Sequence, residues 1–383
     1  MWRITILGYY GQKNTGDDAL AVTVLRGIGQ HMAQAHFYIH SDPLVVPSGF
    51  RVSFAPSGWA VKIRGLRRLS LIFRSMYWAD IVVLGGGSVI HDLLGPSHLI
   101  AKVRFFKHLK VLGKKLAAVG LGIGPLRTPQ GKAAARDLLK LFDFVAVRDE
   151  RSLEEARSIS APVTKVAFDP AVLLEKAGLP EWRDDPYLTK DPHRPIFGIS
   201  VCDFHRFLGH GESADRKRFQ KLVRALQNVK WGETEVWLFE FNGHPLYGDM
   251  PLLRNLQLAL KNRIHCKIVP YSPNPLIMLR RLKQCRAVLA MRLHAAVYSF
   301  ASGVPFVVLS YHPKCSAFAQ MVGLPLEAQL DSEKFKWQEL VDKINALLSN
   351  DKFGVPSLSI AEAQVLAERN FEWFAKLAGG GLE

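Results

Sequence analysis

The stretch GYYGQKNTGDDAL, residues 8–20, follows the first apolar run of the chain, ITIL at 4–7, and opens a helical pattern. Its glycines permit tight turns and a close approach of the backbone to a ligand. Backbone N–H groups at the start of such a helix bind anions. Asp17 or Asp18 can cap the helix. Since one cap needs only one aspartate, we expect the other to accept a hydrogen bond from a substrate hydroxyl or to act as a base.

Short apolar runs alternate with helical patterns along the chain. The first series includes DIVVLGGG, KLAAVGLGIG and FVAVRD, and a polar, proline-rich linker separates it from a second series that includes IFGISVCDF, EVWLFEFN, AVLAMR and PFVVLSY. Such alternation is typical of βαβ units around a parallel sheet. The sequence therefore predicts an α/β protein with two doubly wound, Rossmann-like domains facing across a cleft. We place them at 1–180 and 193–350, with a helix in 351–378 packing back on the first.

Ligands of open parallel sheets bind beyond the carboxyl ends of the strands. In the first half, VVLGGGSVIHD places His91 and Asp92 after a glycine-rich strand end. In VAVRDERSLEEA, a capping box from Ser152 to Glu155 accounts for the helix start and leaves Arg148 free to face the cleft.

Polar residues also follow the strands of the second half. His205 and Arg206 come after its first strand, and Asn242 and His244 after its second. Capping or solvated loop roles remain the alternative for these positions.

One passage of the second half carries a stronger signal. Arg292 and His294 interrupt an otherwise apolar passage from strand to helix. A buried cation is costly unless it is paired. The pattern therefore leaves two partners open for Arg292, an internal Asp or Glu and an anionic ligand, and we favour the ligand.

Composition restricts the class of protein. Of 383 residues, 48% are hydrophobic and 22% charged, which is typical of a globular chain, and the formal charge is +16. Many of the Lys and Arg residues fall in 60–115, in two amphipathic stretches. They form either a solvated surface or a docking face for an anionic membrane. Basic and aromatic residues are not interleaved as in a nucleic-acid-binding module, so we expect no nucleic-acid partner.

Cysteine spacing and hydropathy predict the cofactors and the location. The four cysteines show no metal-ligand spacing, so we expect no metal and a reducing compartment. We also expect no secretory signal and no transmembrane helix. The predicted location is cytoplasmic, peripheral at the inner face of the membrane.

The motifs GYYGQKNTGDDAL, LGGGSVIHD, GLGIGP, VRDERS, DPAVLL and MRLHAAVYSFASGVPFVVLSYHPK occur in this order and together resemble the polysaccharide pyruvyltransferase family. The resemblance runs from near residue 4 to about 320. It implies a GT-B-like fold. It also implies transfer of the pyruvyl group of phosphoenolpyruvate to two hydroxyls of a sugar, with formation of a cyclic ketal and release of phosphate. The sugar would belong to a cell-surface polysaccharide or its lipid-linked precursor, and phosphoenolpyruvate would be a co-substrate, with no cofactor.

The resemblance also implies roles for individual residues. The Arg-Leu-His motif of the family falls on Arg292, Leu293 and His294, which would hold phosphoenolpyruvate. As our own hypothesis, consistent with these residues, His294 would serve as the acid and Asp17 as the base. The acceptor side would be formed by a larger set: Asn14, Gly16, Asp17, Asp92, His205, Asn242 and His244.

This sequence departs from the family pattern at one position. Many members carry an Arg directly after the first strand of the second half, where this chain has Cys202 and Asp203. Arg206 or Arg148 is our candidate for the second donor-binding cation.

Two other function classes remain open. A GT-B glycosyltransferase that uses a nucleotide sugar would share the fold, but the region after 300 lacks the acidic residue expected to hold a ribose until Glu327. A non-catalytic protein that binds an anionic polysaccharide or membrane would explain the charge alone.

Overall fold

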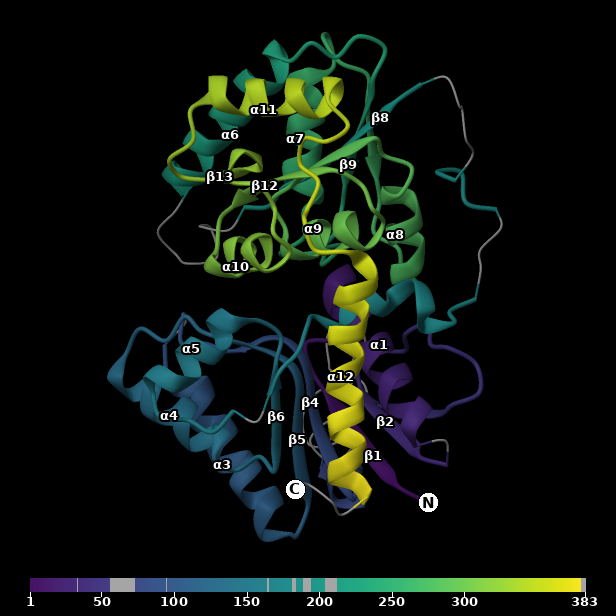
Figure 1. Ribbon diagram of the computed structural model, residues 1–383, viewed down its shortest axis with the longest axis vertical. Helices are drawn as coiled ribbons and strands as arrows, with labels where there is room; N and C mark the ends of the chain where they lie inside the picture. Colours follow the sequence, from purple (N-terminus) through teal and green to yellow (C-terminus); the bar gives the residue numbers. More distant parts are fainter. Residues whose placement is uncertain are drawn as a thin grey trace. The chain divides into compact units, whose positions relative to one another are not determined.

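The computed structural model describes residues 1–383 except 33, 56–72, 94, 164, 181–183, 189–193, 204–211 and 380–383. The chain forms two compact units. The first comprises Met1–Gln12, Gly16–Pro180 and Ala361–Glu383, and the second comprises Lys13–Thr15 and Glu181–Ile360. Each unit is built on one parallel sheet with helices on both faces (Figure 1). The prediction of two Rossmann-like α/β units is confirmed.

The first unit has a seven-stranded sheet with the order β3-β2-β1-β4-β5-β6-β7. Its strands are β1 (Arg3–Leu7), β2 (His36–His40), β3 (Arg51–Ala55), β4 (Ile81–Ile90), β5 (Lys115–Ile123), β6 (Phe144–Val147) and β7 (Lys165–Val166). Its helices are α1 (Thr15–His31), α3 (Ser97–Val111), α4 (Pro129–Leu139), α5 (Glu150–Ser158), the 3-10 helix η1 (Pro170–Ala177) and α12 (Ile360–Gly379).

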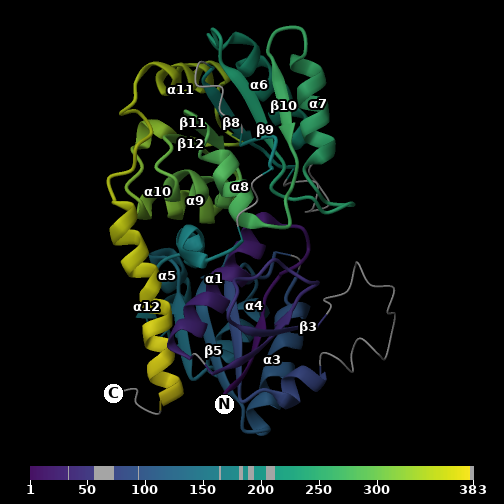
Figure 2. The same cartoon turned by 90° about the vertical axis from the view of Figure 1, so that its right-hand side faces the viewer.

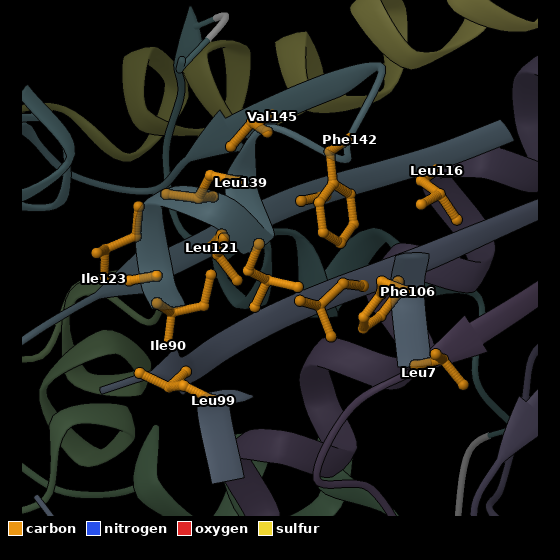
Figure 3. Packing of buried hydrophobic residues seen from close by; sticks show 14 of the residues in the cluster. Leu7, Ile90, Leu99, Phe106, Leu116, Leu121, Ile123, Leu139, Phe142 and Val145 are labelled. Atoms are coloured by element: carbon orange, nitrogen blue, oxygen red, sulfur yellow. The ribbon is translucent and has the colours of Figure 1, made fainter. Parts of the chain in front are cut away.

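The two faces of this sheet are covered by different helices. Helices α3, α4 and α5 cover one face, and α1 and α12 lie on the other (Figure 1). Between the sheet and α3–α5, apolar side chains such as Leu99, Phe106, Leu121 and Phe142 form a buried cluster (Figure 3). Because side chains alternate between the faces of a strand, near-continuous apolar strands such as β4 and β5 suit a sheet buried on both sides.

Helix α12 runs beside α1 in both views of the molecule (Figures 1 and 2). Phe371 and Phe374 of α12 are fully buried. Arg26 of α1 forms an ion pair with Glu368 at 2.9 Å. The side chain of Asn370 accepts a hydrogen bond from the backbone N–H of Gly120 at 3.0 Å, so this C-terminal helix is bound to the first sheet by polar contacts as well as apolar ones.

The second unit has a six-stranded sheet with the order β10-β9-β8-β11-β12-β13. Its strands are β8 (Ile196–Ser200), β9 (Glu235–Phe239), β10 (Cys266–Val269), β11 (Ala287–Ala290), β12 (Phe306–Ser310) and β13 (Gln329–Asp331). Its helices are α6 (Glu212–Asn228), α7 (Met250–Leu260), α8 (Pro275–Leu282), α9 (Leu293–Ala301), α10 (Pro313–Met321), the 3-10 helix η3 (Leu326–Ala328) and α11 (Trp337–Ser349). Helices α6, α7 and α11 lie on one face, and α8, α9 and α10 on the other (Figure 1).

Strand order locates the ligand-binding edge of each sheet. The order reverses between β1 and β4 in the first unit and between β8 and β11 in the second. Ligands of open α/β sheets bind at such switch points, beyond the carboxyl ends of the strands. The loops to consider are therefore those that follow β1 and β4, and those that follow β8 and β11.

No helix in the described ranges combines the length and the apolar character that crossing a bilayer requires. Of the two basic stretches, the one at 60–72 lies outside the described residues, whereas α3 is described in full.

Candidate active site

Arg292 lies at the switch point of the second unit, directly before α9, and its partner is Asp249. Nε of Arg292 donates to Oδ2 of Asp249 at 2.7 Å, and Nη2 donates to Oδ1. The Asp249 side chain is 2% exposed and that of Arg292 is 15% exposed. Burial alone would lower the pKa of Arg292, but Asp249 raises that pKa above its ordinary value. Of the two partners left open for Arg292, the structure shows the internal carboxylate, which we did not favour.

The ion pair nevertheless leaves part of the guanidinium available. Among the described residues, Nη1 of Arg292 has no hydrogen-bond partner. Arg292 is the N-cap residue of α9, yet its side chain makes no capping hydrogen bond. Arg292 thus begins α9 and carries a cation, and a helix N-terminus and a guanidinium each favour an anion.

His294 lies in the first turn of α9, two residues after Arg292, and is partly buried. Helical spacing keeps both residues at the N-terminal end of α9. The next loop along the sheet, after β12, begins with Tyr311 and His312. Burial raises the pKa of Tyr311 well above its ordinary value, so this phenol stays protonated at neutral pH. His312 caps α10, since Nδ1 of its ring accepts from the backbone N–H of Lys314 at 3.2 Å.

Asn242 and His244 form the loop that holds Asp249. The backbone N–H of Asn242 donates to Oδ2 of Asp249 at 3.0 Å, and its carbonyl accepts from the N–H of Asp249 at 2.8 Å. Nδ1 of His244 accepts from the N–H groups of Leu246 and Tyr247 at 3.1 and 3.2 Å. Burial and the charge of Lys13 lower the pKa of His244. The backbone of Asn242 and the ring of His244 thus order the loop that positions Asp249, the partner of Arg292.

Residues 13–15 of the opening motif belong to the second unit. The N–H of Thr15 donates to the carbonyl of Phe241 at 2.9 Å, and the N–H of Gly243 donates to the carbonyl of Lys13 at 2.8 Å. Asn14 forms an antiparallel bridge with Asn242. A segment from the start of the chain therefore pairs with the loop that orders Asp249.

The rest of the opening motif belongs to the first unit. Helix α1 begins at Thr15, so Asp17 and Asp18 lie inside its first turn. The prediction that one of them is the N-cap was therefore wrong. Oδ1 of Asp18 accepts from the N–H of Gly11 at 2.8 Å, which fixes the turn. Asp17 is partly exposed. Of the pair, Asp18 is buried and Asp17 is the more exposed carboxylate.

Asp17 lies against the triple glycine of β4. A Cβ added at Gly87 would lie 3.4 Å from Oδ1 of Asp17, and both Gly86 and Gly87 have positive φ. Tyr10 donates to the carbonyl of Gly85. Burial and, to a lesser extent, the charge of Asp17 raise the pKa of Tyr10. The first switch point therefore combines a partly exposed carboxylate with buried glycines, two of which have positive φ.

Asp92, which we expected to bind the acceptor, is an internal cap. It is 3% exposed, and its carboxylate accepts from the N–H of Arg127 at 2.7 Å and from the N–H and hydroxyl of Thr128 at 2.6 and 2.7 Å. Burial raises the pKa of Asp92, but these hydrogen bonds outweigh burial and lower it. Its oxygens are committed to the start of α4, which does not fit contact with a sugar.

Arg148 is also committed to internal partners. Its Nε and Nη1 each lie 3.3 Å from a carboxylate oxygen, of Asp149 and Asp169 respectively, and Nη2 donates to Ser88 at 2.9 Å. Its side chain is 4% exposed. The expectation that Arg148 is free to bind the donor was wrong, because it neutralises two buried carboxylates of the first unit.

The predicted capping box of α5 was wrong for a related reason. Asp149 is the N-cap and accepts from the N–H of Ser152 at 2.7 Å. Oγ of Ser152 instead accepts from the N–H of Ile123, and Glu155 from that of Leu126.

Three further candidate residues remain. His205 and Arg206 lie outside the described residues, and Gly16 is a buried residue at the start of α1.

The sequence reasoning missed Asp249 and Arg218. Pro251 marks the start of α7 and makes Asp249 a plausible cap, but nothing in the sequence links it to a residue 43 positions away. Arg218 is one basic residue among several in the amphipathic α6, yet it is 6% exposed.

Comparisons with known proteins agree with this picture. The family model for polysaccharide pyruvyl transferase matches residues 14–313. The amylovoran biosynthesis protein AmsJ of Erwinia amylovora is 24% identical over 285 residues, a match that covers 71% of this chain and 66% of that protein. The chain thus matches just under two thirds of the length of this curated relative.

Solved structures share the fold over the whole chain. Anabaena HepE in complex with UDP-glucose superposes with a TM-score of 0.60 at 13% identity, over 100% of both chains. The UDP-GlcNAc 2-epimerase from Neisseria meningitidis, bound to UDP-GlcNAc, gives 0.62 at 11% identity over 99% of both chains. At these identities the likeness shows the fold alone, which is GT-B-like. With the family model matched from the opening motif to the loop after β12, the chain belongs to the polysaccharide pyruvyl transferase family.

Proposed function

We propose that this protein transfers the pyruvyl group of phosphoenolpyruvate to two hydroxyls of one sugar, forming a cyclic ketal and releasing phosphate. The observation that carries the proposal is the family match across both units, with Arg292 and His294 at the switch point of the second sheet. The sugar would be part of a cell-surface polysaccharide or its lipid-linked precursor, in keeping with the likeness to an amylovoran biosynthesis protein.

The donor is assigned to the second unit. Nη1 of Arg292 and the first N–H groups of α9 bind the phosphate of phosphoenolpyruvate, because a dianion is stabilised by both a guanidinium and a helix N-terminus. Asp249 holds the guanidinium of Arg292 in one orientation, because its two carboxylate oxygens accept from Nε and Nη2 of the arginine. The site is therefore organised before the donor arrives, which limits the entropy lost on binding.

Proton transfers are assigned to His294 and Asp17. His294, as an imidazolium, gives its proton to C3 of the enol and leaves an oxocarbenium-like centre at C2. Asp17 takes the proton of the first sugar hydroxyl as its oxygen bonds to C2. The C2–O bond to phosphate then breaks and phosphate leaves, and the second hydroxyl gives its proton to the now neutral His294 as its oxygen bonds to C2 and closes the ketal. A histidine suits the first step because its pKa lies near neutrality.

Ligand-dependent thermal unfolding tests the donor assignment. Phosphoenolpyruvate should raise the unfolding midpoint of the wild-type protein by mass action, and nucleotide sugars should not. The shift should vanish in Arg292→Gln and persist in Arg286→Gln, whose arginine precedes the same strand and pairs with Asp351 in a more exposed setting. A shift with a nucleotide sugar alone would contradict the proposal and favour a glycosyltransferase, the activity class of some GT-B proteins.

A second assay tests the acid. His294→Gln should retain the thermal shift with phosphoenolpyruvate but lose phosphate release in the presence of acceptor. Full activity of this variant would remove His294 from its role. If His294→Gln lost affinity for phosphoenolpyruvate but released phosphate at the wild-type rate once saturated with it, the assignment of His294 as the acid would also be contradicted.

We further propose that the protein is cytoplasmic and peripheral at the inner face of the membrane. The exposed face of α3 combines the basic side chains of Arg104 and Lys107 with the apolar ones of Ile100 and Val111. Basic residues near an anionic surface contribute about 1 kcal/mol each. Co-sedimentation with anionic vesicles at low salt should fall in Arg104→Glu/Lys107→Glu, and not in Lys217→Glu on α6. Equal sedimentation of the first variant and the wild type would exclude this face.

A further inference from the structure

A second arginine lies at the switch point of the second sheet, in a pocket beside Arg292. Side chains from several elements line the pocket, including Cys202 after β8, Met291 after β11, Arg218 and Phe219 of α6, and Leu252 of α7. Met291 directly precedes Arg292 in the chain. The pocket is therefore formed at the edge of the sheet to which the donor is assigned.

Arg218 is buried in this pocket and is only partly satisfied. Its Nη2 donates to the carbonyl of Cys202 at 3.2 Å and pairs with Asp215 one turn earlier. The side chain is 7% exposed. Its Nη1 is buried and has no hydrogen-bond partner among the described residues. Buried donors are normally paired, so a guanidinium N–H in the wall of a pocket points to an acceptor that a ligand supplies.

The charges of Arg292 and Arg218 both act on the thiol of Cys202. Burial raises the pKa of the Cys202 thiol to about 12, while the positive charges of Arg292 and Arg218 oppose that rise. The N–H of Cys202 also lies 3.5 Å from the sulfur of Met291. Cys202 thus lies within the electrostatic reach of two arginines that come from different helices.

Phosphoenolpyruvate carries two anionic groups, and among the described residues Nη1 is the one nitrogen of Arg292 that makes no hydrogen bond. The dianionic phosphate suits Arg292, because α9 adds its N-terminal N–H groups there. The carboxylate needs a separate donor. We infer that Arg218 binds the carboxylate of the donor, and takes the place of the arginine that this chain lacks after β8. The inference rests on the proposed function and identifies the second anion-binding residue of that same site.

Titration calorimetry with two probes, phosphoenolpyruvate and inorganic phosphate, tests the assignment. In Arg218→Gln the affinity for phosphoenolpyruvate should fall roughly tenfold or more, because a charge-assisted hydrogen bond is lost. The affinity for inorganic phosphate should change little. Arg216→Gln, two residues earlier on the exposed side of α6, should behave as wild type for both probes.

The outcomes separate the two proposals. A wild-type protein that binds neither probe would overturn the proposed function. A wild-type protein that binds phosphoenolpyruvate, with unchanged affinity in Arg218→Gln, would overturn the role of Arg218 alone. An equal loss of affinity for both probes would overturn the assignment to the carboxylate.

A conservative variant keeps the test decisive if Arg218→Gln fails to fold. Arg218→Lys retains the charge beside Asp215 but not the planar fork of donors. Weaker binding of phosphoenolpyruvate by a folded Arg218→Lys, with phosphate binding retained, supports the inference. Wild-type affinity for phosphoenolpyruvate in that variant would overturn it.

Discussion

Arg148 and Arg292 each follow a buried parallel strand, one in each unit, and they differ in how their nitrogens are used. Each follows a buried strand of a parallel sheet, β6 or β11, and each is paired with carboxylate in the interior. Arg148 uses all three nitrogens, on Asp149, Asp169 and Ser88. Arg292 uses two nitrogens on one carboxylate and is more exposed.

This difference separates a structural arginine from a ligand-binding one. An arginine with an internal partner at each of its three nitrogens is poorly placed to bind a ligand, whereas one held by a bidentate carboxylate is oriented and keeps one nitrogen without a partner. A buried cation after a strand is therefore not by itself a site. The number of its donors that the protein satisfies decides the role.

The largest effect is expected for Arg148→Gln. Two buried carboxylates lose their cation, and breaking a buried ion pair in this way costs about 3–5 kcal/mol. Urea unfolding should show a loss of this size, and Arg136→Gln, an exposed arginine paired with Asp137, should show almost none. Per folded molecule, the affinity for phosphoenolpyruvate should be unchanged. A stable variant that binds the donor weakly would reverse the roles of the two arginines.

A smaller loss of stability is expected for Asp249→Asn. The amide keeps the shape of the side chain but loses the charge that Arg292 meets, at a cost of about 2–3 kcal/mol. Since Arg292 is then less firmly oriented, the affinity for phosphoenolpyruvate should fall too. Asp351→Asn removes the partner of the more exposed Arg286 and should affect neither quantity measurably. Tighter donor binding in Asp249→Asn would mean that the carboxylate competes with the ligand rather than supporting it.

The sequence predicted the fold well because alternation of apolar runs and helical patterns is a local signal. It also placed Arg292, His294 and Asp17 after strands, as the structure has them, while their roles stay predictions. It could not predict which polar residues already have internal partners. Asp249 pairs with Arg292, and Asp92 with Thr128, through contacts between distant positions. The cap of α5 is a local feature, yet the sequence could not decide between Asp149 and Ser152 as the N-cap without the backbone geometry.

Acid should weaken the first unit through a buried histidine. His40, at the end of β2, has a ring nitrogen 2.6 Å from Oγ of Ser75, and burial lowers its pKa from 6.5 to about 4. A lowered histidine pKa means that the fold prefers the neutral ring. Its contribution is thus complete above pH 6.5 and is lost as pH falls toward 4. At pH 5 the loss should be about 2 kcal/mol.

Urea unfolding at a series of pH values would measure this loss. In His40→Gln the decline between pH 7 and pH 5 should be shallower than in the wild-type protein. A variant with the same decline as the wild type would assign the acid sensitivity to other groups.

The smallest effect is expected for Asp92→Asn, which applies the same reasoning to a carboxylate. All the contacts of Asp92 described above lie within the first unit, and a Cβ added at Gly131 would lie 2.3 Å from Oδ2 of Asp92. The amide can accept some of these hydrogen bonds but presents N–H to the backbone N–H of Thr128, so stability should fall by about 1 kcal/mol. When phosphate release from phosphoenolpyruvate is measured at a series of acceptor concentrations, the KM for the sugar should be the same in Asp92→Asn as in the wild-type protein. A raised KM for the sugar at unchanged stability would contradict this prediction. It would mean that Asp92, like Arg292, has internal partners and still contacts a ligand.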